Sequence, residues 1–122
     1  SNCVIAGLSV GGSHTLVITA NYPDMFMHIG LFSSGVDFTR IVKGEVPAYA
    51  NFEGKLAKLA QTNPNLYWIA CGSADGLMPA NKQLMERMTK NGLKYTFHES
   101  SRGHLWSNWR QYSLMFIPQL FK

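Results

Sequence analysis

The most restrictive feature of the sequence is the run at residues 66–71, Leu-Tyr-Trp-Ile-Ala-Cys, which contains no charged side chain. A continuous apolar strand has no polar face, so it is typical of a parallel sheet that helices cover on both sides. Shorter apolar runs at residues 3–6 and 26–32, and alternating side chains at residues 94–99, predict three more strands. The run at 66–71 therefore indicates a layered α/β architecture.

Helical segments are expected between these strands and after the last one. They cover residues 9–21, 50–61, 79–91 and 105–121. Alternating strands and helices imply right-handed crossovers, which place the strands parallel in one sheet. The segment at residues 36–49 contains Gly44 and Pro47 and is expected to be irregular.

Two of these helices carry apolar faces that are expected to pack on the sheet. In the 79–91 helix, Pro79 suits the first turn and Gly92 the position after the last. In the 105–121 helix, Pro118 is expected to bend or fray the end. The inward side chains are expected to be Leu84, Met85 and Met88 in the first helix, and Trp106, Trp109, Phe116, Ile117 and Leu120 in the second.

Composition and charge exclude several functional classes. With 122 residues, of which 46% are hydrophobic and 15% charged, the chain can form one domain or part of one, and disorder is not expected. Eleven Lys and Arg against seven Asp and Glu give a net charge of +4, but the basic residues are scattered along the chain. A nucleic-acid surface would need them clustered, and no apolar run approaches the roughly 18 residues that a membrane span requires.

A tight turn is predicted at residues 7–11, Gly-Leu-Ser-Val-Gly, where the first strand ends and the first helix begins. Such a turn strains the backbone of its central residue, Ser9, and presents the hydroxyl at the carboxyl end of the strand. Gly7 and Gly11 are expected to prevent clashes between the strand and helix backbones. The alternative is an ordinary glycine-rich helix start with Ser9 as its N-cap.

Two further polar residues are predicted at the same edge of the sheet. Asp75 follows the 66–71 strand and His104 follows the 94–99 strand. The carboxyl ends of parallel strands meet at one edge, so Ser9, Asp75 and His104 are expected to converge there. A serine, an imidazole and a carboxylate in this order could act as nucleophile, base and orienting group. Asp75 as a plain turn former and His104 as a surface residue are the alternatives.

The remaining cysteines and histidines point to structural roles. Cys3 and Cys71 both lie in apolar strand-like runs, so buried thiols are expected rather than a disulfide or a catalytic role. His14, His28 and His98 share no metal-ligand spacing with a Cys, another His or a carboxylate. They are expected to be structural or to face solvent.

At this point the motifs resemble a known family. The quoted segments are residues 5–12 (Ile-Ala-Gly-Leu-Ser-Val-Gly-Gly), 21–26 (Asn-Tyr-Pro-Asp-Met-Phe), 32–35 (Phe-Ser-Ser-Gly), 70–75 (Ala-Cys-Gly-Ser-Ala-Asp) and 103–110 (Gly-His-Leu-Trp-Ser-Asn-Trp-Arg). In this order they resemble the esterase D-like branch of the α/β-hydrolases, and within it the feruloyl and acetyl-xylan esterases of carbohydrate esterase family 1. The resemblance implies a partial α/β-hydrolase fold of about four mostly parallel strands with flanking helices.

The resemblance also implies site residues and a reaction. Ser9, Asp75 and His104 match the catalytic triad, and the Val10 N–H would serve the oxyanion hole; Trp106 and Leu77 are expected to line the substrate pocket. The implied reaction is hydrolysis of carboxylic esters, with feruloyl or acetyl groups on xylan-type polysaccharide as the substrate, in a periplasmic or secreted setting. An S-formylglutathione hydrolase, a siderophore esterase, or a non-catalytic hydrolase-like binding or assembly domain are the alternatives.

The match covers only part of a family domain. Relatives carry further strands and a second oxyanion donor upstream of the turn that corresponds to residues 7–11, so residues 1–122 are expected to be the C-terminal half of an esterase domain and poorly active alone. The 3–6 strand would then be an open edge, and a homodimer through that edge is expected. No cofactor, metal ion, nucleic acid or membrane partner is implied.

Overall fold

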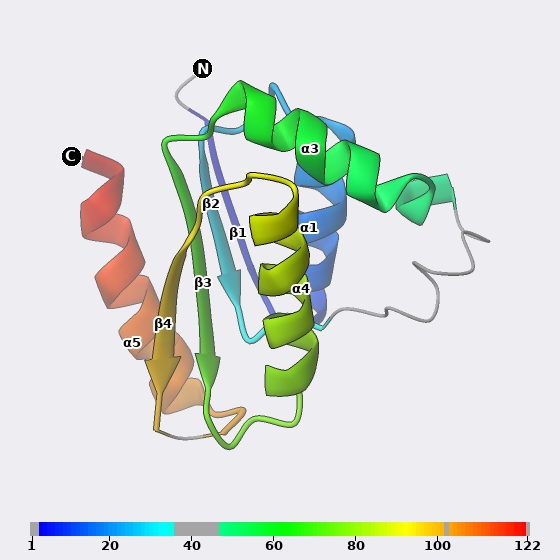
Figure 1. Ribbon diagram of the computed structural model, residues 1–122. Helices are drawn as coiled ribbons and strands as arrows, with labels where there is room; N and C mark the ends of the chain where they lie inside the picture. Colours follow the sequence, from blue (N-terminus) through cyan, green and yellow to red (C-terminus); the bar gives the residue numbers. More distant parts are fainter. Residues whose placement is uncertain (1–2, 36–46, 102, 122) are drawn as a thin grey trace.

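The computed structural model describes residues 3–35, 47–101 and 103–121, and within these ranges it contains one parallel sheet (Figure 1). Its strands lie in the order β1-β2-β3-β4. In register, Val4 is opposite His28, which is opposite Leu66. The strands are β1 (Val4–Leu8), β2 (His28–Phe32), β3 (Leu66–Gly72) and β4 (Thr96–Ser100). The expected α/β class and parallel sheet are confirmed.

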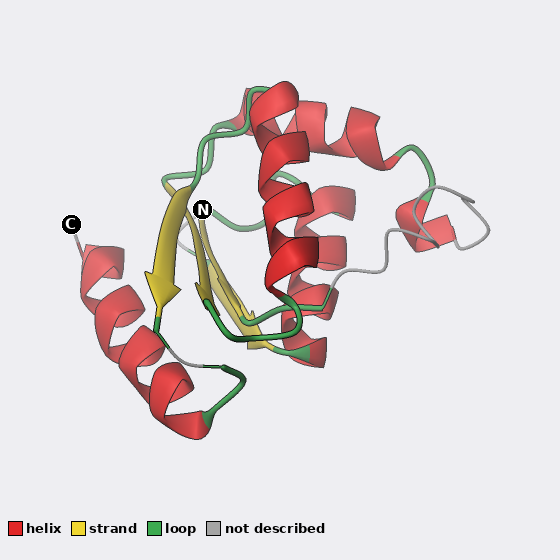
Figure 2. Ribbon diagram, turned by 60° about the horizontal axis from the view of Figure 1, so that its bottom comes forward, coloured by secondary structure: helices red, strands yellow, loops and turns green. Residues whose placement is uncertain are grey.

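Helices cover both faces of this sheet. One face carries α1 (Val10–Asn21), α3 (Phe52–Thr62) and α4 (Met78–Lys90), and the opposite face carries α5 (Trp106–Phe116) (Figure 2). Short 3-10 segments span Pro47–Tyr49 and Ile117–Phe121. No helix in the described ranges has the length and apolar character needed to cross a membrane. The expected irregular segment at residues 36–49 falls outside the described residues up to position 46.

The core is divided by the sheet into two layers, and β3 explains why. Tyr67 and Ile69 pack into the layer beneath α1, α3 and α4, while Trp68 and Ala70 pack into the layer beneath α5. All four are at most 2% exposed. Since adjacent residues of a strand point to opposite faces, a strand with apolar residues at every position is buried on both sides. Large side chains buried in this way contribute about 1.5–3 kcal/mol each.

The predicted inward side chains of α4 and the predicted ends of α4 and α5 are found in the structure. Leu84, Met85 and Met88 of α4 are buried as predicted, and Gly92 follows the helix with a left-handed φ of 79°. Proline cannot donate the backbone hydrogen bond of a helix interior, and Pro118 lies in the 3-10 segment that follows the end of α5 at Phe116.

The inward face of α5 differs from the prediction. Phe116 is buried, and the half-buried side chains of Trp109 and Leu120 pack against the core as predicted, but Ile117 is 52% exposed. The helix turns by about 100° per residue, so the position next to buried Phe116 points away from the sheet, and fully buried Tyr112 lies on the inward face instead. The Trp106 side chain lies outside the described part of the structure.

β1 forms an edge of the described sheet, since it pairs there with β2 alone. The register places Val4, Ala6 and Leu8 on the same face of the sheet as α5. Val4 remains 40% exposed. Unpaired backbone groups beside exposed apolar side chains favour strand addition. We propose that two copies pair their β1 edges about a two-fold axis.

This association is testable by light scattering coupled to gel filtration. At micromolar concentration we expect twice the chain mass of 13.6 kDa. Val4→Lys should shift the protein to the monomer because it places a charge on the pairing edge. Gln61→Lys, on the exposed side of α3, is the control that should remain dimeric. A wild-type monomer at these concentrations would refute the proposal.

Candidate active site

The site begins at the turn between β1 and α1. Ser9 has φ 55° and ψ −117°, a conformation that residues with a Cβ adopt rarely and at an energetic cost. The Ser9 N–H donates to the Phe32 carbonyl at 2.9 Å, and the Ser9 carbonyl accepts from the N–H groups of Ser13 at 3.2 Å and Gly35 at 3.3 Å. The predicted strained turn is therefore present, and backbone bonds to β2, to the loop after it and to α1 hold it in place.

The glycines around the turn do not share one role. A Cβ added at Gly7 would lie 2.1 Å from the Gly11 carbonyl oxygen, so only glycine fits there. A Cβ at Gly11 would meet nothing within 4 Å, and the expectation that Gly11 itself relieves a clash is wrong. The second crowded position is Gly12, where a Cβ would lie 2.4 Å from the Cβ of Ser34. Close backbone approach thus requires Gly7 and Gly12.

Asp75 lies in the loop between β3 and α4 and is only 5% exposed. Its Oδ1 accepts from the Leu77 N–H at 2.9 Å, which is the two-residue side-chain turn that aspartate commonly forms. Its own carbonyl accepts from the Met78 N–H at 3.0 Å. These bonds direct the other oxygen, Oδ2, toward His104 Nδ1 at 2.8 Å. The carboxylate is also close to the N-terminal end of α4, where the helix dipole favours negative charge.

His104 lies in the loop between β4 and α5 and bridges the other two residues. Its Nε2 is 3.0 Å from Ser9 Oγ, while its Nδ1 contacts Asp75. When Nδ1–H donates to the carboxylate, Nε2 presents a lone pair that can accept the serine proton. The structure thus brings together the three residues that the sequence placed at one edge of the sheet. An arrangement of this kind can activate a serine hydroxyl as a nucleophile.

Val10 is the first residue of α1 and directly follows Ser9. A backbone N–H at the first position of a helix has no acceptor within that helix. It is therefore available to an oxygen bound beside Ser9, and the positive end of the helix dipole adds to the attraction for negative charge. The position suits the oxyanion donor that the sequence predicted.

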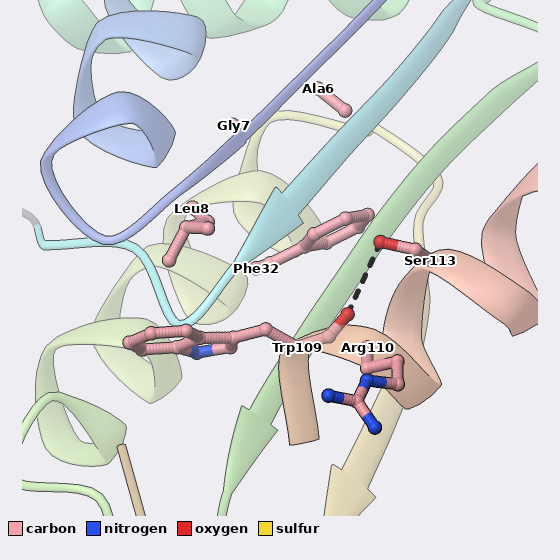
Figure 3. A pocket seen from close by; sticks show the side chains of 7 residues that line it. All are labelled: Ala6, Gly7, Leu8, Phe32, Trp109, Arg110 and Ser113. Atoms are coloured by element: carbon pink, nitrogen blue, oxygen red, sulfur yellow. Dashed lines mark hydrogen bonds between the residues drawn. The ribbon is translucent and has the colours of Figure 1, made fainter. Parts of the chain in front are cut away.

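A groove of about 520 Å³ lies between β1 and α5, on the α5 face of the sheet (Figure 3). Leu8 and Trp109 connect it to the site, because Leu8 precedes Ser9 and the Trp109 ring contacts the His104 ring. Leu77, which was expected in the substrate pocket, does not line this groove. The lining residues are Ala6, Gly7, Leu8, Phe32, Trp109, Arg110 and Ser113.

The buried amide of Asn81, which was not among the predicted site residues, connects the loops of the site. Asn81 is fully buried, and its Nδ2 donates to the carbonyls of Ser34 and Leu77, each at 2.9 Å. The signal was available in the sequence. Asn81 precedes Leu84, Met85 and Met88 by three, four and seven residues, so it is a polar residue on the apolar face of α4. A polar side chain in that position must find partners inside the protein.

The remaining histidines stay apart from the site. His98 stacks on Trp68 with ring centroids 6.0 Å apart, and His28 lies in β2 with a buried Nδ1 that has no hydrogen-bond partner. Among the side chains that the structure describes, no three His, Cys, Asp or Glu residues are grouped so that they could hold a metal ion.

The two cysteines differ in environment, which corrects the expectation that both are buried. Cys3 is exposed, whereas Cys71 is fully buried. Burial, together with the negative charge of Asp75, raises the pKa of the Cys71 thiol to about 12. Since only the thiolate is nucleophilic, Cys71 should remain protonated and inert near neutral pH.

Alkylation with iodoacetamide at pH 8 checks this difference. We expect one modified thiol, Cys3, in the native protein and two after unfolding in urea. A Cys3→Ser variant should remain unmodified until it is unfolded. Modification of native Cys71 at the rate of Cys3 would show that the buried environment is wrong.

Comparison with known proteins places the chain in a class and then in a family. The strand order, the turn that carries Ser9 and the loops that carry Asp75 and His104 define a partial α/β-hydrolase fold. The family described as "Putative esterase" matches residues 1–115, so the chain belongs to that family. Both findings agree with the resemblance recognised in the sequence.

Solved structures support the same fold. A ferulic acid esterase is similar with a TM-score of 0.77 and 18% identity, over 96% of this chain and 50% of that one. The S-formylglutathione hydrolase FrmB of Staphylococcus aureus gives 0.74 and 20%, over 96% and 50%. The fluorophosphonate-binding serine hydrolase FphF of the same organism gives 0.76 and 18%, over 96% and 53%. The chain therefore spans about half the length of these proteins.

Proposed function

We propose that the natural protein carrying this sequence is a serine hydrolase of carboxylic esters, with Ser9 as the nucleophile. The observation that carries the proposal is the continuous chain of hydrogen bonds from Asp75 Oδ2 through the His104 ring to Ser9 Oγ, at 2.8 and 3.0 Å. It occurs on a strained turn at the carboxyl end of a strand, where the serine oxygen is presented to a ligand.

In the proposed reaction, Ser9 Oγ attacks the ester carbonyl while His104 Nε2 takes the serine proton. The oxygen of the tetrahedral intermediate gains negative charge and accepts a hydrogen bond from the Val10 N–H. His104 then protonates the departing alcohol, leaving an acyl group on Ser9. Water attacks this acyl-enzyme with His104 again as base, and the carboxylic acid leaves. Throughout, Asp75 holds the Nδ1–H and stabilises the imidazolium.

A fluorophosphonate probe tests this proposal, because it reacts with an activated serine without requiring the natural ester. We expect labelling of Ser9 in the natural protein that carries this sequence, and its loss in Ser9→Ala. Ser107→Ala removes an exposed hydroxyl at the start of α5 and should be labelled normally. A folded protein that is not labelled at Ser9 would contradict the proposal and favour a non-catalytic binding or assembly domain.

Feruloyl or acetyl esters of xylan-type polysaccharide are the substrates that we propose. Support comes from the ferulic acid esterase among the similar structures and from the groove beside the site. Its wall includes two aromatic side chains, Phe32 and Trp109, and Trp109 also contacts His104. Aromatic rings prefer edge-to-face or offset contacts with other rings. The groove therefore suits an aromatic acyl group.

A side chain that fills the groove should reveal which acyl group uses it. Ser113 lies on the groove wall (Figure 3). We expect Ser113→Phe to raise KM for a feruloyl ester about 10-fold or more, because a blocked pocket rejects the larger group, and to leave acetyl ester hydrolysis unchanged.

Two results would argue against this use of the groove. Equal losses for both esters in Ser113→Phe would show that the groove does not select the acyl group. Faster hydrolysis of S-formylglutathione than of feruloyl and acetyl esters would favour the alternative esterase of the same branch. Ser107→Phe, on an exposed position of the same helix, is the matched control.

A further inference from the structure

We infer that Trp109, held by the buried hydroxyl of Ser33, is a positioning residue for the His104 imidazole. This inference rests on the proposed function, because it assigns a role in orienting the base of that reaction. It concerns two residues that lie 76 positions apart in the sequence and are joined by one side-chain hydrogen bond.

The His104 ring needs a restraint that its hydrogen bonds do not supply. These two hydrogen bonds, to Asp75 and to Ser9, are made by the two nitrogens of the ring, Nδ1 and Nε2. They resist sliding of the ring but only weakly resist tilting about the line that joins the two nitrogens. The side chain is also 35% exposed, so solvent rather than protein lies over part of it. A contact from a further side chain can therefore help to fix the tilt.

Trp109 provides that contact. Its ring and the His104 ring have centroids 4.8 Å apart and an interplanar angle of 85°, the edge-to-face arrangement that aromatic pairs favour. An indole held at this distance limits how far the imidazole can move toward it.

The indole can act in this way only if its own orientation is fixed, and Ser33 fixes it. The Trp109 Nε1–H donates to Ser33 Oγ at 3.1 Å. Ser33 is fully buried at the end of β2, and its N–H donates to the Ala70 carbonyl of β3 at 2.8 Å. The restraint on the indole thus comes from the sheet and not from the exposed loop that carries His104.

The backbone of Ser33 supports a specific use of its hydroxyl. Its φ of 49° lies in the left-handed region, where glycine would be less strained. Strained backbone conformations are found mainly where the residue has a functional role. Asn108, which precedes Trp109 in α5, also helps to position His104. Its Nδ2 donates to the Gly103 carbonyl at 2.9 Å and so holds the backbone next to His104.

The experiment compares Ser33→Ala with Ser34→Ala in the 122-residue chain, using the imidazole proton resonances of His104 in NMR spectra. Ser33→Ala should move these resonances toward those of an unrestrained histidine, because the ring-current effect of a fixed indole is lost. Ser34→Ala removes the adjacent buried hydroxyl, which contacts Asn81 at 3.3 Å, and should leave the His104 resonances in place. Trp109→Leu should reproduce the Ser33→Ala shift, while Trp109→Phe, which keeps a ring, should restore part of it.

Kinetics in the natural protein provide the second readout. Ser33→Ala should lower kcat about 10- to 100-fold with little change in KM, as expected for a misplaced catalytic group. Unchanged His104 resonances in both Ser33→Ala and Trp109→Leu, each folded, would overturn the inference. Should the wild type fail to react with a fluorophosphonate while these resonances still shift, the proposed function would fail and the positioning contact would stand.

Discussion

Replacing Asp75 by asparagine is expected to lower the rate of Ser9 labelling by a fluorophosphonate about 10⁴-fold with little change in stability. The Leu77 N–H bonds Oδ1 at 2.9 Å and should keep an oxygen at that position. The amide NH₂ of the new residue would then face His104 Nδ1. A donor there forces the imidazole proton onto Nε2, so the nitrogen beside Ser9 no longer accepts a proton.

The measurement is the second-order labelling rate of the natural protein, with thermal unfolding as a check on the fold. Asp24→Asn removes an exposed carboxylate from the loop after α1 and is the matched control for the change in net charge. A loss smaller than about tenfold would mean that Asp75 does not set the tautomer of His104, and the assigned roles would have to be revised.

Gly7→Ala is expected to cause the largest loss of stability, at or above the upper end of the roughly 1–3 kcal/mol typical of overpacking. The new methyl group would meet the Gly11 carbonyl oxygen at 2.1 Å, its carbon at 2.4 Å and Thr15 Oγ1 at 2.5 Å. The first two atoms belong to the backbone of α1, which Ser9 ties to β2 and to the loop after it. The clash can be relieved only by moving the turn that carries Ser9, so Ser9 labelling should fall as well.

Gly11→Ala is the matched control for this prediction. It introduces the same methyl group on the other side of the turn, into open space. Within a helix the change from glycine to alanine should stabilise by about 0.5–1 kcal/mol. Urea denaturation should therefore move the two midpoints in opposite directions. Equal midpoints would show that the close packing of β1 on α1 is not as described.

The fold followed from sequence patterns because each of them depends on neighbours along the chain. The apolar run of β3 specified burial on both faces, and the ends of β1, β3 and β4 placed Ser9, Asp75 and His104 at one edge. What the sequence did not reveal depends on partners distant along the chain. The prediction for Trp109 considered only its own helix and so did not include its hydrogen bond to Ser33, 76 residues away.

Two predictions of burial, for Cys3 and Ile117, were wrong because residue type alone does not determine how exposed a side chain is. Cys3 and Cys71 lie in similar apolar runs, but Cys3 lies just before an edge strand of the described sheet and Cys71 lies within a central strand. Ile117 is as apolar as Phe116, yet it points away from the sheet. Such differences are properties of the assembled layers, and no local pattern of residues contains them.

The buried amide of Asn81 has a mechanical consequence. Its Nδ2 donates to the Ser34 carbonyl, and the N–H of the next residue, Gly35, donates to the Ser9 carbonyl. The same Nδ2 donates to the Leu77 carbonyl, and the Leu77 N–H donates to Asp75 Oδ1. The backbone segments that carry the Ser9 hydroxyl and the Asp75 carboxylate are thus both linked to one buried side chain. A change at Asn81 would therefore alter the distance between Ser9 and Asp75, which the imidazole of His104 has to bridge.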